Sequence, residues 1–144
     1  MIHVNSVTSA LFTLMSSDSV LVSSGFTVEE GEAFNRDINH TPWVGLYYGE
    51  MTIDPHTLGG DRPWQAQLDL FLYVQAGSHL SGQEVTRALA RSQSRVLDVV
   101  NADKTLGGAV QMLESITVAP FRRDIHENTW LFTNEIVLKA SLRG

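Results

Sequence analysis

The chain has 144 residues, of which 43% are hydrophobic and 18% charged, a composition that indicates one globular domain and excludes a disordered or fibrous protein. Sixteen acidic residues against ten basic ones give a formal net charge of −6, which argues against a strong general attraction to nucleic acid or anionic lipid. The absence of cysteine excludes disulfides, thiolate metal sites and a thiol nucleophile.

The first predicted element is a helix over residues 2–15, because apolar side chains recur there three or four positions apart. The short polar side chains at 16–19 favour a turn after it. The apolar stripe of this predicted helix consists of Val4, Val7, Ala10, Leu11 and Leu14.

A short extended piece is predicted at 20–22, and residues 23–41, which lack a sustained period, are interpreted as a connection with no more than a short turn of helix. The N-terminal segment lacks the basic opening and continuous apolar run of a secretory signal. No apolar run reaches the roughly 20 residues needed to cross a bilayer, so a soluble protein is predicted.

Two strands are predicted next, on either side of a loop. Residues 42–49, Pro-Trp-Val-Gly-Leu-Tyr-Tyr-Gly, are aromatic and β-branched and follow a proline. A loop is predicted at 50–62 from its turn-forming residues, and the strand at 64–74 shows the clearest alternation in the chain. Its apolar face consists of Trp64, Ala66, Leu68, Leu70, Leu72 and Val74.

Ser81 and Glu84 have the spacing of a capping box and predict the start of a second helix that ends near Asn101. A turn at 104–108 follows this helix. The apolar stripe of the helix consists of Val85, Ala88, Leu89, Val96, Val99 and Val100.

The last predicted elements are strands at 110–118 and 129–142, joined by a connection at 120–128. In the final strand the apolar face has a single polar interruption, Asn134. Residues 1–144 are therefore predicted to form a single α+β domain, with a mainly antiparallel (mixed) sheet flanked by two helices that cover one face.

The titratable residues give little indication of catalysis. None of the five histidines has the spacing of a metal-binding pair, and no Gly-x-Ser-x-Gly sequence is present. His56 lies between Asp54 and Asp61, so a small metal-dependent enzyme remains an alternative to a polar exposed loop. We predict no catalytic residue, no metal site and no cofactor, and hence no enzyme.

The sequence Thr-Leu-Gly-Gly occurs twice, at 57–60 and 105–108. Neither copy has the Lys-Ser/Thr ending of a phosphate-binding loop, and the flanking residues of the two copies differ. We interpret the two copies as turns of the same chemistry.

Two surface features favour an assembly. Arg87, Arg91 and Arg95 stand four residues apart on the second predicted helix and form a basic stripe, which is either a solvated face or a contact with a carboxylate-bearing neighbour. Phe71 and Tyr73 point away from the apolar face of their strand, so either the chain itself or a second subunit must cover them.

The layout of the whole chain is more informative than any single motif. It consists of a short N-terminal helix, the run Thr41-Pro42-Trp43-Val44-Gly45-Leu46-Tyr47-Tyr48, the strand at 64–74, a Ser-Gly-x-Glu helix, the run Asp103-Lys104-Thr105-Leu106-Gly107-Gly108-Ala109-Val110 and a long final strand. This layout, over nearly all of the chain, resembles the tail terminator proteins of long-tailed bacteriophages, also called tail completion or minor tail protein U proteins.

This resemblance implies a structural virion protein without catalytic activity. Its copies would form a hexameric ring that caps the tail tube, ends tube polymerisation and provides the surface for head joining. The implied partners are further copies of the chain, the tail tube protein and a neck or head connector protein. DNA would pass through the lumen without specific binding, and the protein would reside in the virion tail and, during assembly, in the host cytoplasm.

The resemblance also implies where contacts lie, because loops carry adaptable surface on a rigid sheet. The predicted contacts with partner proteins are Asp54, Asp61, Arg62, Arg122, Arg123 and Asp124. The predicted contacts between copies are Phe71, Tyr73, Arg87, Arg91 and Arg95.

Several alternatives stay open. A neck or head-closure protein and a tail tube subunit would share the ring architecture with a terminator. A monomeric ligand-binding domain and the metal-dependent enzyme built on His56 belong to other functional classes.

Overall fold

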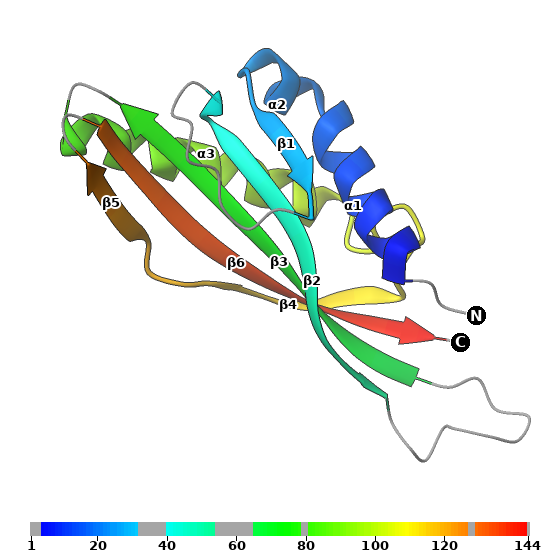
Figure 1. The fold of residues 1–144 in the computed structure, drawn as a ribbon. Helices are drawn as coiled ribbons and strands as arrows, with labels where there is room; N and C mark the ends of the chain where they lie inside the picture. The colour runs from blue at the N-terminus through cyan, green and yellow to red at the C-terminus, as the bar shows by residue number, and fades with distance from the viewer. Residues whose placement is uncertain (1–3, 32–39, 54–64, 79–80, 127–128, 144) are drawn as a thin grey trace, which may run out of the picture.

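The structure is a computed structural model that describes residues 4–31, 40–53, 65–78, 81–126 and 129–143. Within these ranges three helices and a six-stranded mixed sheet form an α+β fold, as predicted (Figure 1). The helices are α1 (Val4–Ser17), α2 (Ser19–Ser23) and α3 (Gly82–Ala102). The strands are β1 (Thr27–Glu30), β2 (Trp43–Ile53), β3 (Gln65–Ser78), β4 (Met112–Val118), β5 (Arg122–His126) and β6 (Thr129–Arg143).

The strands follow the order β1-β2-β3-β6-β4, and β5 also pairs with β6. Strand β6 pairs with β3 along nearly its whole length on one side, and with β4 and β5 one after the other on the opposite side. All of these pairs are antiparallel except β1 with β2, which is parallel. The mainly antiparallel sheet predicted from the sequence is therefore confirmed.

The core lies between one face of the sheet and the helices α1 and α3, which confirms that two helices cover one face (Figure 1). The predicted apolar face of β3 is buried from Ala66 to Val74, and Leu68, Leu70 and Leu72 are each 0% exposed, whereas Trp64 lies outside the described residues. The polar interruption in β6, Asn134, is also buried, and its Nδ2 donates a hydrogen bond to the carbonyl oxygen of Ala119 at 3.1 Å. This bond satisfies an amide that would otherwise destabilise the core.

Helix α3 begins as predicted, because the Ser81 hydroxyl accepts a hydrogen bond from the backbone N–H of Glu84 at 3.2 Å. Helix α2 contradicts the extended piece predicted at 20–22. The Asp18 carboxylate accepts hydrogen bonds from the N–H groups of Val20 and Leu21, both at 3.0 Å, and this cap favours a helical turn over an extended one. None of the described helices is long and apolar enough to span a membrane.

Two strands were not predicted from the sequence, and several predicted strand ends are displaced. Pairing with β6 extends β3 to Ser78 instead of 74, and β4 begins at Met112 instead of 110. Strand β1 lies within the predicted connection 23–41 and is held by pairing with β2, where the N–H of Thr27 donates to the carbonyl of Pro42 at 2.9 Å. Strand β2 continues to Ile53 through a bulge after Tyr48, so the loop predicted from residue 50 begins too early. Strand β5 occupies most of the predicted connection 120–128 because it pairs with β6.

The turn after α3 contains the second Thr-Leu-Gly-Gly copy. The Asp103 carboxylate accepts hydrogen bonds from the hydroxyl of Thr105 at 2.9 Å and from the N–H of Gly107 at 2.8 Å. These bonds, that of Thr105 first, lower the pKa of Asp103. Gly107 and Gly108 have φ angles of 69° and 89°, which explains the two glycines. The first copy, 57–60, lies outside the described residues.

Candidate interaction surface

The face of the sheet that points away from α1 and α3 is called the outer face here. Strand register places Tyr47 of β2 beside Phe71 of β3, and Tyr73 of β3 beside Glu135 of β6. Phe71 and Tyr73 were predicted to lie opposite the apolar face of their strand, and this placement is confirmed. The outer face carries two features. One is an aromatic cluster on β2 and β3, and the other is a polar groove nearer one end of the strands.

The aromatic cluster consists of Tyr47, Phe71 and Tyr73. Their ring centroids are 5.5 Å apart for Tyr47 and Phe71, 6.0 Å for Tyr47 and Tyr73, and 6.3 Å for Phe71 and Tyr73. These separations are typical of stabilising aromatic pairs. Tyr47 is 40% exposed and Tyr73 only 9%, so the chain buries Tyr73 itself and presents Tyr47 to the surface.

Gly49 makes the position of Phe71 possible. A Cβ atom at residue 49 would collide with the Phe71 ring, so the ring covers the backbone of β2 where a side chain would otherwise stand. An aromatic side chain placed over a strand glycine in this way stabilises both strands.

Glu135 links the aromatic cluster to β5. The Tyr73 hydroxyl donates a hydrogen bond to Glu135, and the Glu135 carboxylate lies 3.8 Å from the Arg122 guanidinium. Burial of Tyr73, reinforced by the negative charge of Glu135, raises the pKa of Tyr73 to about 12. The neutral phenol is therefore the stable form of this residue in the folded chain.

The raised pKa predicts a loss of stability in alkali. Because the pKa of Tyr73 is about 12 in the folded chain and 10.0 ordinarily, its stabilising contribution is complete below pH 10 and is lost as the pH rises to 12. We expect a loss of about 1 kcal/mol, smaller than the full linkage value because water screens the partly exposed Glu135.

The measurement is urea unfolding of the wild type and Tyr73→Phe at several pH values between 9 and 12. The variant is expected to show a shallower fall in unfolding free energy over this range. Tyr48→Phe is the control, because Tyr48 is 49% exposed. Equal slopes for the wild type and Tyr73→Phe would contradict the prediction.

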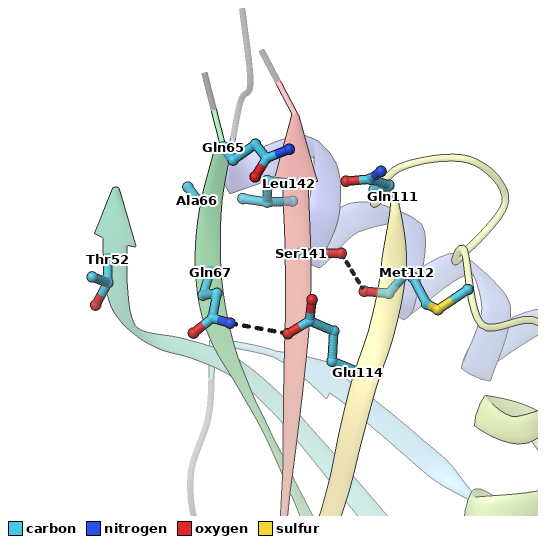
Figure 2. A pocket seen from close by; sticks show the side chains of 9 residues that line it. All are labelled: Thr52, Gln65, Ala66, Gln67, Gln111, Met112, Glu114, Ser141 and Leu142. Carbon is cyan, nitrogen blue, oxygen red and sulfur yellow. Dashed lines mark hydrogen bonds between the residues drawn. The ribbon is translucent and has the colours of Figure 1, made fainter. Parts of the chain in front are cut away.

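The polar groove lies where β2, β3, β6 and β4 approach one end of the sheet (Figure 2). It is an open groove of about 740 Å³. The Gln67 amide donates a hydrogen bond to the Glu114 carboxylate at 3.0 Å, across β6, and the Ser141 hydroxyl donates to the carbonyl of Met112 at 3.2 Å. Its lining residues are Thr52, Gln65, Ala66, Gln67, Gln111, Met112, Glu114, Ser141 and Leu142.

The lining of the groove is mostly uncharged amide and hydroxyl groups, with Glu114 as its one ionisable side chain. Such groups form hydrogen bonds readily but do not activate a nucleophile or hold a cation on their own. Among the described residues, no three His, Cys, Asp or Glu side chains are placed to share a metal ion. The chemistry of the groove suits contact with another protein surface.

The predicted partner contacts in the second half of the chain lie on β5 rather than in a loop. Arg122, Arg123 and Asp124 are all exposed. Arg122 pairs with Thr133 of β6, and Asp124 pairs with Leu131 of β6, so Arg122 and Asp124 point to the outer face. Arg123, which lies between them, points to the helix side. Their role as contacts stays a prediction.

The predicted basic stripe lies on α3, where Arg87 and Arg91 are exposed and Arg95 is half-buried. Arg91 and Arg95 line a small pocket of about 200 Å³ beside Thr41 and Pro42. The role of the stripe in contacts between copies also stays a prediction. Asp54, Asp61 and Arg62, as well as His56, lie outside the described residues.

Sequence reasoning missed Tyr47, Gly49 and Glu135 as parts of one cluster with Phe71 and Tyr73. Tyr47 and Gly49 belong to the strand predicted at 42–49, and Glu135 to the strand predicted at 129–142. Alternation indicates which face a residue occupies, but the neighbouring residue depends on strand order and register. The one available signal was the aromatic residues on the less apolar faces of two predicted strands.

The fold is shared with a known virion component. A search of solved structures finds a chain of the virion of a native gene transfer agent particle, with a TM-score of 0.51 and 13% sequence identity. The match covers 96% of this chain and 95% of that chain, so the two domains agree in extent. No protein-family model and no curated protein matches the sequence.

Proposed function

We propose that this chain is a structural protein of a phage-like virion, and specifically a tail terminator. Its copies form a ring that caps the tail tube, ends tube polymerisation and offers a surface for joining the head. The protein has no catalytic role and needs no cofactor. Its partners are further copies of itself, the tail tube protein and a connector protein, and its place is the virion tail.

The observation that carries the proposal is the fold similarity to a chain of a gene transfer agent virion over nearly the whole length of both chains. Neither chain has a large segment outside the shared domain, and this agreement supports a shared structural role in a particle. The layout of the sequence, from the Pro-Trp-Val-Gly-Leu-Tyr strand entry to the long final strand, favours the terminator among virion proteins.

The surface of the described domain suits an assembly. It presents an aromatic cluster and a polar groove on a sheet face that no described helix covers. A small subunit of a ring contacts two neighbouring copies in the ring, and also the tube on one side and a connector on the other. Much of its surface must therefore take part in contacts. The formal net charge of −6 is compatible with DNA sliding through the ring without binding to it.

The test is to add the purified protein to polymerising tail tube subunits of the same virion. We expect shorter tubes, each with an extra ring at one end in negative-stain images. An unrelated protein of similar size and charge is the control. Tubes of unchanged length without an end cap would contradict the terminator role.

The same images separate the other virion proteins. A tail tube subunit would polymerise into long stacks without any addition. A neck or head-closure protein would bind connectors and leave bare tube ends. Either of these results would replace the terminator by another structural role.

A further inference from the structure

Among the described strands, the sheet ends in β1 on one side, and in β4 and β5, which follow one another along β6, on the opposite side. Among the described residues, β1 has β2 as its one strand neighbour, and β5 has only β6. The two strands lie on opposite sides of the sheet (Figure 1). Backbone N–H and C=O groups on the open side of an edge strand can pair with a strand of another chain.

The two open edges lie at the same level of the sheet. Register connects Thr27 of β1 to Arg122 of β5 by one row across the sheet, through Trp43, Gln75 and Thr133. A second copy can therefore bring its β5 beside β1 with little displacement along the strands. This condition matters for a ring, because a contact closes by rotation only if each copy stays at the same height.

The strand directions also match. Strand β1 is parallel to β2, and the three following pairs, β2 with β3, β3 with β6 and β6 with β5, are antiparallel. Three reversals make β5 antiparallel to β1. A second copy with its outer face on the same side therefore presents β5 as an antiparallel neighbour of β1, which gives the more stable type of ladder.

The two edges carry guanidinium and carboxylate groups that can pair with each other. Glu29 lies in register with Gly45, Tyr73 and Glu135 and so belongs to the outer face, whereas Glu30 lies on the helix side. On β5, Arg122 points to the outer face and Arg123 to the helix side. Each face of the β1 edge thus carries a carboxylate. Each face of the β5 edge carries a guanidinium, and the outer face of β5 also carries the carboxylate of Asp124, so the β5 strand keeps an excess of one positive charge over Arg122, Arg123 and Asp124.

Exposed apolar side chains accompany both edges. Val20 and Val22 are 51% and 61% exposed on α2, the helix that leads into β1. At the other edge, Phe121 and Ile125 are 40% and 53% exposed. An antiparallel alignment that places Glu29 opposite Arg122 places Ile125 opposite Phe26, close to the end of α2. Contact between the apolar side chains would then add to the pairing of backbone and charge.

We propose that the β1 edge of one copy pairs with the β5 edge of the next copy in an antiparallel ladder, with Glu29 opposite Arg122 and Glu30 diagonal to Arg123. The inference rests on the proposed ring function and identifies the contact between its subunits. Because the two edges differ, the contact is head-to-tail and propagates around a ring. Arg122 lies between Glu29 of the neighbour and Glu135 of its own chain.

The charges also explain why identical edges do not pair. Two β1 edges would bring four glutamates together, and two β5 edges would bring four arginines together with two copies of Asp124, which leaves an excess of positive charge. Charged edge strands protect a sheet against random association. In this chain the opposite charges restrict the association to unlike edges, which selects the head-to-tail contact over a two-fold dimer.

The test compares three proteins, each used as the full chain: the wild type and the two charge-reversed variants E29R/E30R and R122E/R123E. Light scattering over a wide concentration range at low salt gives the mass of each, with negative-stain images of the same samples. We expect the wild type to form closed rings and each variant alone to associate at least about 100-fold more weakly, because both of its edges carry the same charge. Circular dichroism melts check that each variant is folded.

Mixing the two variants in equal amounts is the decisive step. Each variant then offers the charge that the other one lacks, so closed rings of alternating copies are expected to form again. The control is K104E/K139E, which changes the net charge as much as R122E/R123E does, at two exposed residues away from both edges. It is expected to form rings like the wild type.

Three results would overturn the inference: rings formed equally well by either variant alone, no recovery on mixing, or a wild type that stays monomeric at every concentration. The capping of tail tubes by the wild type is measured separately. Tube capping together with unaffected edge variants would disprove the edge contact and leave the terminator role standing. Rings that fail to cap tubes would disprove the terminator role and leave the edge contact standing.

Discussion

Replacement of Leu72 by alanine is expected to lower the free energy of unfolding by about 2–5 kcal/mol. Leu72 is 0% exposed and lies in the middle of β3, with Leu46 of β2 on one side and Ile136 of β6 on the other. The core cannot collapse around the missing atoms, because the ladders on both sides fix the distance between the strands.

Urea unfolding monitored by circular dichroism measures this effect. Ile116→Ala is the matched control, because it also removes part of an aliphatic side chain from a strand but at a position that is 37% exposed. The control is expected to lose less than about 1.5 kcal/mol. Losses of similar size for Leu72→Ala and Ile116→Ala would show that the core does not lie between this face of β3 and the helices.

Gly49→Ala is expected to destabilise the chain by about 1–3 kcal/mol. The new Cβ atom collides with the ring of Phe71, which cannot move freely because Tyr47 and Tyr73 flank it at centroid distances of 5.5 and 6.3 Å. In an ordinary strand position the same substitution would stabilise slightly, since alanine loses less backbone entropy than glycine on folding.

A double-mutant cycle isolates this contact. In the background of Phe71→Ala, the ring is absent and Gly49→Ala should become neutral or slightly stabilising. The four proteins are compared by urea unfolding, and the coupling between the two positions should account for most of the loss. A loss that persists in the Phe71→Ala background would mean that backbone strain, and not the ring, excludes a side chain at residue 49.

The strongly patterned elements were predictable from the sequence. Alternation identified the buried face of β3, and the Ser81 cap located the start of α3, because both signals depend on residues close together in the chain. Strands β1 and β5 were not predictable, since each is four or five residues long with a single apolar side chain, too little to show alternation, and becomes a strand only by pairing with β2 or β6. Helix α2 was missed because its valines favour strands and the Asp18 cap overrides that preference.

The candidate surface was predictable only in part. Phe71 and Tyr73 could be placed on the outer face by alternation alone, whereas their contacts with Tyr47 and Glu135 depend on register. The opposite charges of Glu29 and Arg122 predict no contact from the sequence alone, because more than ninety residues separate them. They become a pair of matching edges only because the strand order places β1 and β5 on opposite sides of the sheet.

The central place of β6 has a consequence for how the protein is made. β6 comes last of the strands in chain order, yet it fills the position between β3 and the pair β4 and β5. Residues 79–128 leave the ribosome between β3 and β6, and at about 5–20 residues per second the edge of β3 that pairs with β6 waits several seconds for its partner. Strands β4 and β5, which have β6 as their one neighbour among the described strands, gain it at the same moment, so the β5 edge forms last. A nascent chain therefore cannot join a ring before its own sheet is complete.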